Sequence, residues 1–168
     1  MKPIQSIPVP MLMVDLPRDR RGYLIPFWQY VPPTFEQDGK VDFRIKHPLR
    51  VTEALRKRLC GICGKPLLKT VYFLGGPDEV NTNTFTDPGM HIQCARYSLA
   101  ACPFLANKDY RPLDRPIEGA VDDITRATFR PEVIVLLGVE RYEIILIPEN
   151  NSFAARLVPP VKSQEEFR

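Results

Sequence analysis

The sequence predicts an α+β fold with a zinc-stabilised centre, short strands, two short helices and an antiparallel β segment near the C-terminal end. Three observations support this prediction. The chain has 18 prolines in 168 residues, about twice the usual share of roughly 5%, which excludes long helices. Cysteine and histidine recur at metal-ligand spacings between residues 60 and 94. Short apolar runs separated by turn residues follow residue 132, as in a β meander.

The N-terminal third is expected to be extended rather than helical. Residues 1–21 contain several prolines and predict an arm that lies across the domain. Residues 22–31 are rich in aromatic side chains and predict an extended segment, while residues 41–46 alternate apolar and polar residues as a half-buried strand does. A short helix is predicted from residue 51 or 52 to residue 58, where alanine, leucine and basic residues favour helix.

The middle of the chain predicts a strand, a turn and a second helix. Residues 71–74 are apolar and aromatic, and a polar turn is expected over residues 78–84. The second helix is predicted from about residue 88 to residue 101. In this prediction Asp87 caps the helix and Pro88 lies in its first turn, where a missing N–H has no cost.

The C-terminal part predicts strands. A helical turn is expected over residues 122–128. Two strands, at residues 133–137 and 142–147, are expected to be joined by a short turn that contains Gly138. A third strand follows at residues 153–158, and the polar tail after it has the spacing of a capping box.

The length of the chain suits one hydrophobic core, so we expect a single domain over residues 1–168. Within it we distinguish a proline-rich N-terminal arm (1–21), a zinc-binding unit (50–105) and a C-terminal β segment (118–160). A content of 44% hydrophobic and 26% charged residues excludes a disordered tail, a collagen-like repeat and a coiled coil.

Four residues form the candidate metal site: Cys60, Cys63, His91 and Cys94. The first two are a Cys-x-x-Cys pair whose glycines allow a tight turn, and the last two are a His-x-x-Cys pair that can share one face of a helix. A knuckle, a hairpin and a helix start, in that order, are the layout of a treble-clef zinc fold. A Cys3His set closes a tetrahedron around one structural Zn²⁺.

Other uses of these cysteines explain the sequence less completely. A thioredoxin-like dithiol should follow a strand and open a helix, but Gly64 and Pro66 come next, and His91 and Cys94 would have no role. Disulfides are disfavoured in a reducing compartment. A catalytic zinc needs an open coordination position, and four protein ligands leave none.

Three further residues have competing interpretations. Cys102 is expected to be a small buried core residue rather than a spare ligand. The sequence offers no catalytic partner for His47, which is expected to be a surface or turn histidine rather than a catalytic residue. Trp28 is expected in the core, the alternative being a stacking platform for nucleic-acid bases.

A basic stretch surrounds the first cysteine pair. Between residues 40 and 69, nine lysines and arginines face two acidic residues, although the net charge of the whole chain is only +3. Such a cluster can contact phosphates or can be a solvated surface, and both interpretations stay open. The candidate nucleic-acid-binding residues are Arg50, Arg56, Lys57, Arg58, Lys65 and Lys69.

No targeting or membrane segment is evident. The N-terminal residues are broken by prolines and lack the apolar run of a signal peptide, and no apolar run approaches the roughly 20 residues that span a bilayer. We therefore expect a cytoplasmic protein that has no membrane partner.

The chain resembles a group of small, largely uncharacterised bacterial and phage-encoded zinc-binding proteins. The resemblance spans roughly residues 14–148 and rests on residues 16–22 and 25–28 and on three later motifs. These motifs are Cys-x-x-Cys-Gly at residues 60–64, Met-His-x-x-Cys-Ala at residues 90–95 and Cys-Pro at residues 102–103. It implies zinc ligands at Cys60, Cys63, His91 and Cys94, and implies that Cys102 belongs to the same unit. It implies no enzymatic activity.

We expect a non-enzymatic zinc-binding module that interacts with nucleic acid or a nucleic-acid-associated protein. The alternative is a phage-type interaction or inhibitor module that binds a host protein. A nuclease of the His-Asn-His type shares the treble-clef scaffold, but no histidine lies between Cys63 and His91 to serve as general base. No small-molecule substrate is expected, because glycine-loop, nucleophile-elbow and His-Glu metal motifs are missing.

Overall fold

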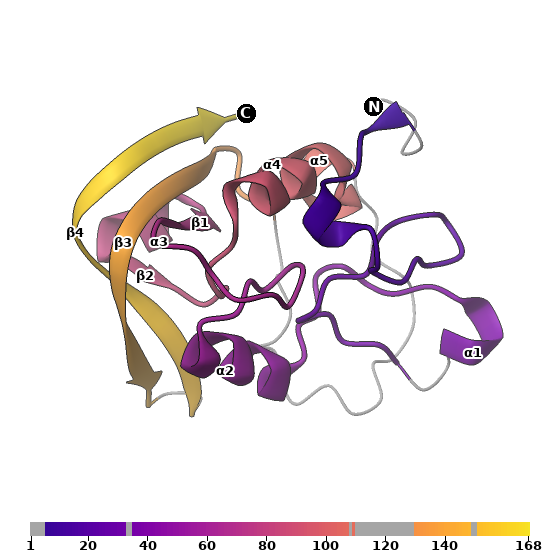
Figure 1. The fold of residues 1–168 in the computed structure, drawn as a ribbon, viewed down its shortest axis with the longest axis horizontal. Helices are drawn as coiled ribbons and strands as arrows, with labels where there is room; N and C mark the ends of the chain where they lie inside the picture. The colour runs from indigo at the N-terminus through magenta and orange to yellow at the C-terminus, as the bar shows by residue number, and fades with distance from the viewer. Residues whose placement is uncertain (1–5, 33–34, 108, 110–129, 149–150) are drawn as a thin grey trace.

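The computed structural model describes residues 6–32, 35–107, 109, 130–148 and 151–168, whose fold is α+β (Figure 1). The strands are β1 (Val71–Gly75), β2 (Thr84–Phe85), β3 (Ile134–Ile147) and β4 (Ser152–Phe167). The helices are α1 (Phe35–Asp38), α2 (Pro48–Lys57), α3 (Pro77–Thr82), α4 (Ile92–Ala101) and α5 (Pro103–Ala106), with a 3-10 turn at Met11–Met13. The predicted fold class, with its antiparallel β segment, is confirmed at this level.

The described strands form one antiparallel sheet in the order β1-β3-β4-β2. Its largest part is the hairpin of β3 and β4, which pairs from Ile147 opposite Ser152 to Ile134 opposite Phe167. Residues 134–139 of β3 are all buried, and β1 pairs with this half of the strand. Figure 1 shows the hairpin curving along one side of the molecule, with the N-terminal segment on the other side.

The prediction of two separate strands around Gly138 is wrong, because β3 runs through this residue without a turn. Gly138 pairs with Tyr72 on one side and with Ser163 on the other. A Cβ atom on Gly138 would lie 2.5 Å from the Ser163 hydroxyl and 2.9 Å from the Tyr72 ring. The glycine therefore permits close packing of neighbouring strands rather than a chain reversal.

The C-terminal tail is also strand rather than a capping box. β4 extends to Phe167, and Glu165 pairs with Leu136 in the buried half of β3. The strand predicted over residues 153–158 is therefore the beginning of a longer one. The last residues of β4 pair with residues about thirty positions earlier in the chain, and local capping signals do not report such long-range pairing.

The two predicted helices exist with shifted starts. α2 begins at Pro48 rather than at residue 51 or 52, and ends at Lys57. Its C-cap is Arg58, whose φ of 51° directs its N–H to the carbonyls of Ala54 and Leu55. α4 begins at Ile92, and its N-cap is His91 rather than Asp87. The backbone before His91 remains extended, because Met90 exchanges two hydrogen bonds with Tyr72, of 2.7 and 2.9 Å.

The polar turn predicted at residues 78–84 is the helix α3. Pro77 occupies its first turn, and the Glu79 carboxylate accepts the Gly76 N–H at 2.6 Å, so two helix-start signals act together. The helical turn predicted at residues 122–128 lies outside the described residues.

The strand predicted at residues 41–46 makes one isolated bridge, between Gln29 and Lys46, instead of a ladder. The buried Gln29 side chain supplies some of the hydrogen bonds that a neighbouring strand would make, since its Nε2 donates to the carbonyls of Asp42 and Ile45, both at 2.8 Å. A side-chain amide thus satisfies backbone groups that a sheet partner would otherwise bind.

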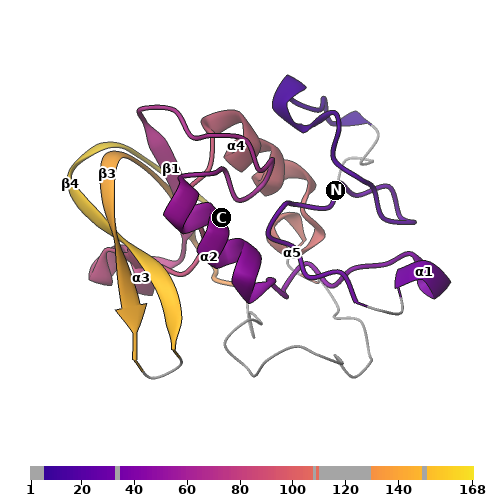
Figure 2. The same ribbon diagram turned by 60° about the horizontal axis from the view of Figure 1, so that its bottom comes forward.

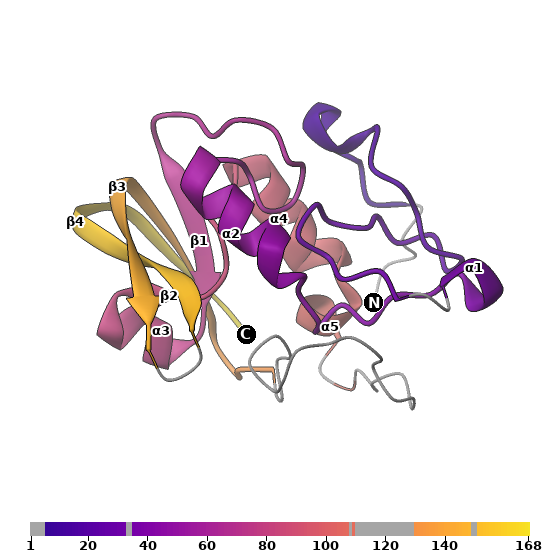
Figure 3. The ribbon, with the colours of Figure 1, turned by 90° about the horizontal axis from the view of Figure 1, so that it is seen from below.

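Two core clusters hold the fold together. The first combines Met13 and Leu24 of the N-terminal segment with α4 and the candidate metal ligands. The second lies between α2 and the sheet and contains Phe73 and Phe85. Trp28 packs against both clusters. Figures 2 and 3 show α2 between the sheet and the N-terminal segment.

Candidate metal centre

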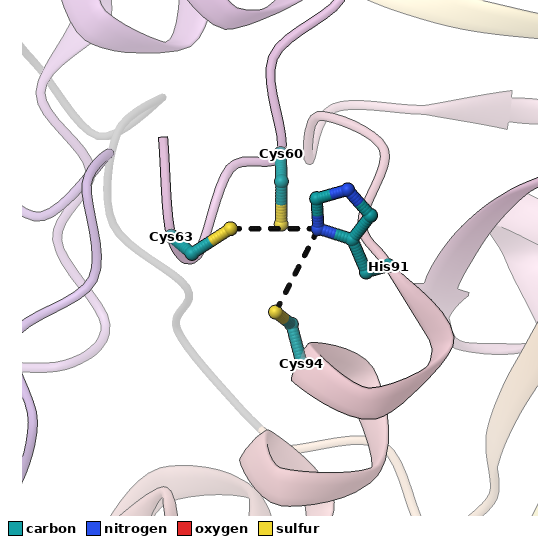
Figure 4. A group of neighbouring side chains, drawn as sticks. All are labelled: Cys60, Cys63, His91 and Cys94. Carbon is teal, nitrogen blue, oxygen red and sulfur yellow. Dashed lines mark hydrogen bonds between the residues drawn. The ribbon is translucent and has the colours of Figure 1, made fainter. Parts of the chain in front are cut away.

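The four predicted ligands lie together in the structure. The sulfur atoms of Cys60, Cys63 and Cys94 and a ring nitrogen of His91 all lie within 4.8 Å of one another, and all four residues are buried. Figure 4 shows the two cysteines of the loop before β1 facing the pair at the start of α4. These residues could hold one metal ion.

The first pair lies on a tight loop fixed by backbone hydrogen bonds. The N–H of Gly64 donates to the Cys60 carbonyl, and the N–H of Cys60 donates to the Lys65 carbonyl, both at 2.8 Å. Gly64 has a φ of 70°, a conformation that glycine adopts without strain. The loop therefore turns both thiols of the Cys-x-x-Cys pair to the same side.

The second pair is joined to the first through the backbone. The Gly61 N–H donates to the Gly89 carbonyl at 3.0 Å, which brings the segment before α4 against the loop. A Cβ on Gly89 would lie 2.2 Å from a Val71 methyl carbon, so only glycine fits this close approach. His91 caps α4 and Cys94 lies in its first turn, which places both side chains at one helix end.

The Pro66 carbonyl orients His91. The Nε2 atom of the ring lies 2.9 Å from this oxygen, so Nε2 carries the proton and donates it to the carbonyl. The unprotonated Nδ1 then faces the thiols, 3.4 Å from the Cys63 sulfur and 3.9 Å from the Cys94 sulfur. Such outer partners fix the tautomer of a metal-binding histidine. The sequence gives no sign of this partner, because every residue has a backbone carbonyl.

Shared hydrogen bonds in this cluster act in opposite directions on the pKa values of Cys60 and Cys94. Hydrogen bonds from the thiols of Cys63 and Cys94 hold Cys60 as a thiolate and lower its pKa to about 3. The same shared hydrogen bonds, together with burial, raise the pKa of Cys94 above its ordinary value. Further thiolates in this buried site need a compensating cation, which a divalent metal ion would supply.

The remaining cysteine lies apart from this group. Cys102 stands between α4 and α5, where its N–H donates to the Ser98 carbonyl at 2.9 Å. Part of the residue is exposed, but protein surrounds the thiol, and this burial raises its pKa to about 11. A thiol with this pKa is protonated and unreactive at neutral pH.

The other two residues singled out from the sequence have structural contacts. His47 is the N-cap of α2, and its ring packs 6.3 Å from that of Tyr30. Trp28 lies over the loop of the first pair, where its backbone N–H donates to the Gly61 carbonyl at 3.1 Å. A Cβ on Gly61 would lie 2.5 Å from the Trp28 ring, so the loop and this side chain are in direct contact.

The candidate nucleic-acid-binding arginines each lie over an aromatic ring. The guanidinium of Arg56 is 4.8 Å from the ring centre of Phe153, and that of Arg58 is 5.0 Å from Tyr142. Both arginines are exposed at the C-terminal end of α2. Arg50, in the first turn of α2, is 5.9 Å from the Phe27 ring centre.

The candidate lysines each have an acidic neighbour instead. Lys57 pairs with Glu53 at 2.8 Å, and Lys65 approaches Asp15 at 3.8 Å. Lys69 approaches Glu140 at 3.5 Å and is 82% exposed. Exposed pairs of this kind contribute at most about 1 kcal/mol, so all three ammonium groups could exchange partners.

In the described part of the chain, none of the helices has the length and apolar character needed to cross a membrane.

No protein-family model, no curated protein and no solved structure matches the chain. The site residues and their geometry therefore carry the functional argument.

Proposed function

We propose that the chain is a non-enzymatic module stabilised by one structural zinc ion, bound by Cys60, Cys63, His91 and Cys94. The observation that carries the proposal is the convergence of these four buried donor atoms within 4.8 Å. In a tetrahedral site with Zn–S and Zn–N bonds of about 2.3 and 2.0 Å, sulfur and nitrogen ligands lie roughly 3.5 Å apart. The distances of 3.4 and 3.9 Å are close to that value.

A treble-clef-like centre is part of this proposal. The loop of the first cysteine pair supplies the knuckle, and the bridge between Tyr72 and Met90 gives a hairpin-like approach of two antiparallel segments. The start of α4 supplies the second ligand pair. Four protein ligands close the coordination sphere, which favours a structural over a catalytic metal.

Metal analysis tests the zinc assignment. Purified protein should contain one zinc ion per chain, and replacement by Co²⁺ should give the visible absorption of a tetrahedral thiolate site. Protein that is purified without zinc and does not take it up, or that binds Co²⁺ octahedrally, would contradict it. The variant Cys102→Ser is the matched control, because this cysteine lies outside the ligand group.

We further propose that the module contacts nucleic acid, or a protein bound to it, through the exposed end of α2. The support is the pair Arg56 and Arg58, whose guanidinium groups are exposed and lie over aromatic rings, where phosphates could reach them. Binding to DNA or RNA should weaken steeply with salt. The double variant Arg56→Ala/Arg58→Ala should reduce the affinity and the salt slope, and Arg96→Ala, another exposed arginine, should not.

One observation favours a protein partner as the second candidate. Within the described residues, positions 141–147 of β3 pair only with β4, so the other edge of this part of the strand is open. An open edge can accept an added strand from another protein. Capture of a host protein that persists after nuclease treatment, together with no measurable DNA or RNA binding, would favour this function over the first.

A further inference from the structure

A cavity of about 360 Å³ lies between the N-terminal segment, the start of α3 and the helices α4 and α5. Its apolar walls include Trp28, Leu74 and Met90. None of the four candidate metal ligands lines it. Small-molecule sites commonly have volumes of about 300–1,000 Å³ and mainly apolar walls with a few polar groups. The cavity thus has the size and lining of a ligand site that is separate from the metal centre.

The polar wall of the cavity is acidic. Asp78, Glu79 and Asp87 line it, and Lys46 supplies a positive charge beside them. The Lys46 ammonium is already bonded to Asp87 and donates to the Thr86 hydroxyl at 3.2 Å. This group of side chains has more carboxylates than ammonium groups, so it favours a cation over an anion.

The charge of Arg44 does not reverse this balance. Its guanidinium also lines the cavity, but it forms an ion pair with Asp42 at 2.6 Å, and both side chains are 7% exposed. A buried pair of this kind is neutral as a unit. The excess negative charge on the wall therefore remains available to a ligand.

Glu79 is the carboxylate that a bound cation would stabilise most. One of its oxygens accepts the Gly76 N–H at 2.6 Å. Burial raises the pKa of this carboxyl, and the nearby Asp87 adds to the rise. A positive charge placed beside the partly buried Glu79 would offset the loss of water around it.

Tyr97 adds a polar group from a different element. The residue is 7% exposed and lines the cavity from α4. Among the described residues its hydroxyl has no hydrogen-bond partner of normal geometry, and the nearby Arg18 guanidinium interacts with it only enough to offset part of the rise in pKa that burial causes. Buried hydroxyls are normally hydrogen-bonded, so a ligand in the cavity could supply the partner.

We propose that this cavity binds a small organic cation, namely a protonated amine on an aromatic body that also carries a hydroxyl group. The ammonium group pairs with Glu79 and Asp87, the aromatic body packs against the apolar wall, and the hydroxyl group hydrogen-bonds with Tyr97. The proposal does not depend on the metal site, because none of the four candidate metal ligands lines the cavity.

Three matched probes test the proposal on the full-length, metal-loaded chain. Tyramine has the ammonium and hydroxyl groups, phenethylamine lacks the hydroxyl, and 3-(4-hydroxyphenyl)propionate replaces the ammonium with a carboxylate. Binding is measured by calorimetry, and by the emission of Trp28, which is the only tryptophan and lines the cavity. Tyramine should bind several-fold tighter than phenethylamine and at least tenfold tighter than the propionate.

Two variants assign the interactions. Glu79→Gln keeps an acceptor for the Gly76 N–H and should weaken tyramine at least tenfold, without weakening the propionate. Tyr97→Phe should remove the difference between tyramine and phenethylamine. Glu53→Gln, on the exposed side of α2, is the control and should change nothing.

Metal content and melting curves show whether each variant is folded. Equal affinities for all three probes, no binding at millimolar concentration, or tyramine binding that Glu79→Gln leaves unchanged would overturn the proposal. If Glu79→Gln does not fold, the proposal is tested by the wild-type protein alone, which must bind tyramine more tightly than the propionate. Folded protein that takes up no metal yet binds the probes as expected would refute the zinc proposal and leave this one standing.

Discussion

At the scale of single residues, His91 joins three features of the structure. Its Nδ1 faces the thiols, its Nε2 bonds to the Pro66 carbonyl, and its backbone caps α4. The spacing of cysteine and histidine predicts this residue and its three partners. The Pro66 carbonyl could not be predicted, because its role depends on where the loop places one backbone oxygen.

The first prediction concerns the ligand cysteines. Cys63→Ser should abolish stoichiometric zinc binding and lower the free energy of unfolding by more than about 4 kcal/mol, since loss of a structural metal is among the largest single-residue effects. Metal content and chemical denaturation measure both quantities. Cys102→Ser should keep one zinc ion per chain, because Cys102 contributes no atom to the ligand group. A Cys63→Ser protein with wild-type zinc content would contradict the assignment.

The second prediction concerns the close approach at Gly89. Gly89→Ala should destabilise the protein by about 1–3 kcal/mol, the usual cost of overpacking, because its Cβ would lie 2.2 Å from a Val71 methyl carbon. Val71→Ala removes this methyl group. In the Val71→Ala background, Gly89→Ala should therefore lower the free energy of unfolding by less, and a double-mutant cycle measures the difference. Equal costs in both backgrounds would show that the contact is not the cause.

At the scale of elements, α2 packs on the β3–β4 hairpin through Tyr142. The Tyr142 hydroxyl donates to the Leu55 carbonyl at 3.3 Å, and the Arg58 guanidinium lies over the ring. The helical pattern of α2 was predictable from its own residues. Its partner strand was not, since the contact joins residues almost ninety positions apart.

The third prediction is a pH dependence at this contact. Burial raises the pKa of Tyr142 above its ordinary value of 10.0, and Arg58 opposes this rise only in part. The folded state therefore binds the phenolic proton more tightly than the unfolded state, so stability is full below pH 10 and falls as the pH rises above it.

Tyr142→Phe removes this titration. The variant should lose about 1 kcal/mol at neutral pH with the hydrogen bond, yet show a shallower decline of stability above pH 10 than the wild type. Denaturation at several pH values measures the slope. Parallel curves for the two proteins would exclude Tyr142 as the source of the alkaline decline.

The sheet shows where local signals were insufficient. Gly138 resembled a turn residue, but it lies inside β3, between the side chains of Tyr72 and Ser163. Glycine suits both situations, and only the neighbouring strands distinguish them. The signals for α3 were present in Pro77 and Glu79, and a prediction that weighed them as a helix start would have found it.

At the scale of the whole molecule, the candidate metal centre connects the N-terminal segment to the rest of the chain. The N–H of Phe27 donates to the Ile62 carbonyl at 2.8 Å, beside the bond from Trp28 to Gly61. The core cluster that contains the three candidate cysteine ligands also contains Met13 and Leu24 from this segment. Order in the loop of Cys60 and Cys63 therefore supports the packing of a distant part of the chain.

The fourth prediction follows from this connection. Removal of zinc by a chelator should lower the melting temperature and shift the Trp28 emission to longer wavelength, because the loop under this side chain loses its metal. Amide exchange should increase at Phe27 and Trp28 before it increases in the β3–β4 hairpin. An unchanged melting curve and unchanged Trp28 emission after complete removal of zinc would contradict the structural role.

The sequence by itself determined the fold class and the four candidate metal ligands, Cys60, Cys63, His91 and Cys94. Donor type and ligand spacing are local properties, and the chain displays them directly. The tertiary structure decided the course of β3 and β4, the start of α4, the Pro66 partner of His91 and the cavity beside Glu79 and Tyr97. Each of these depends on segments far apart in sequence that meet only when the chain is folded, so no local pattern encodes them.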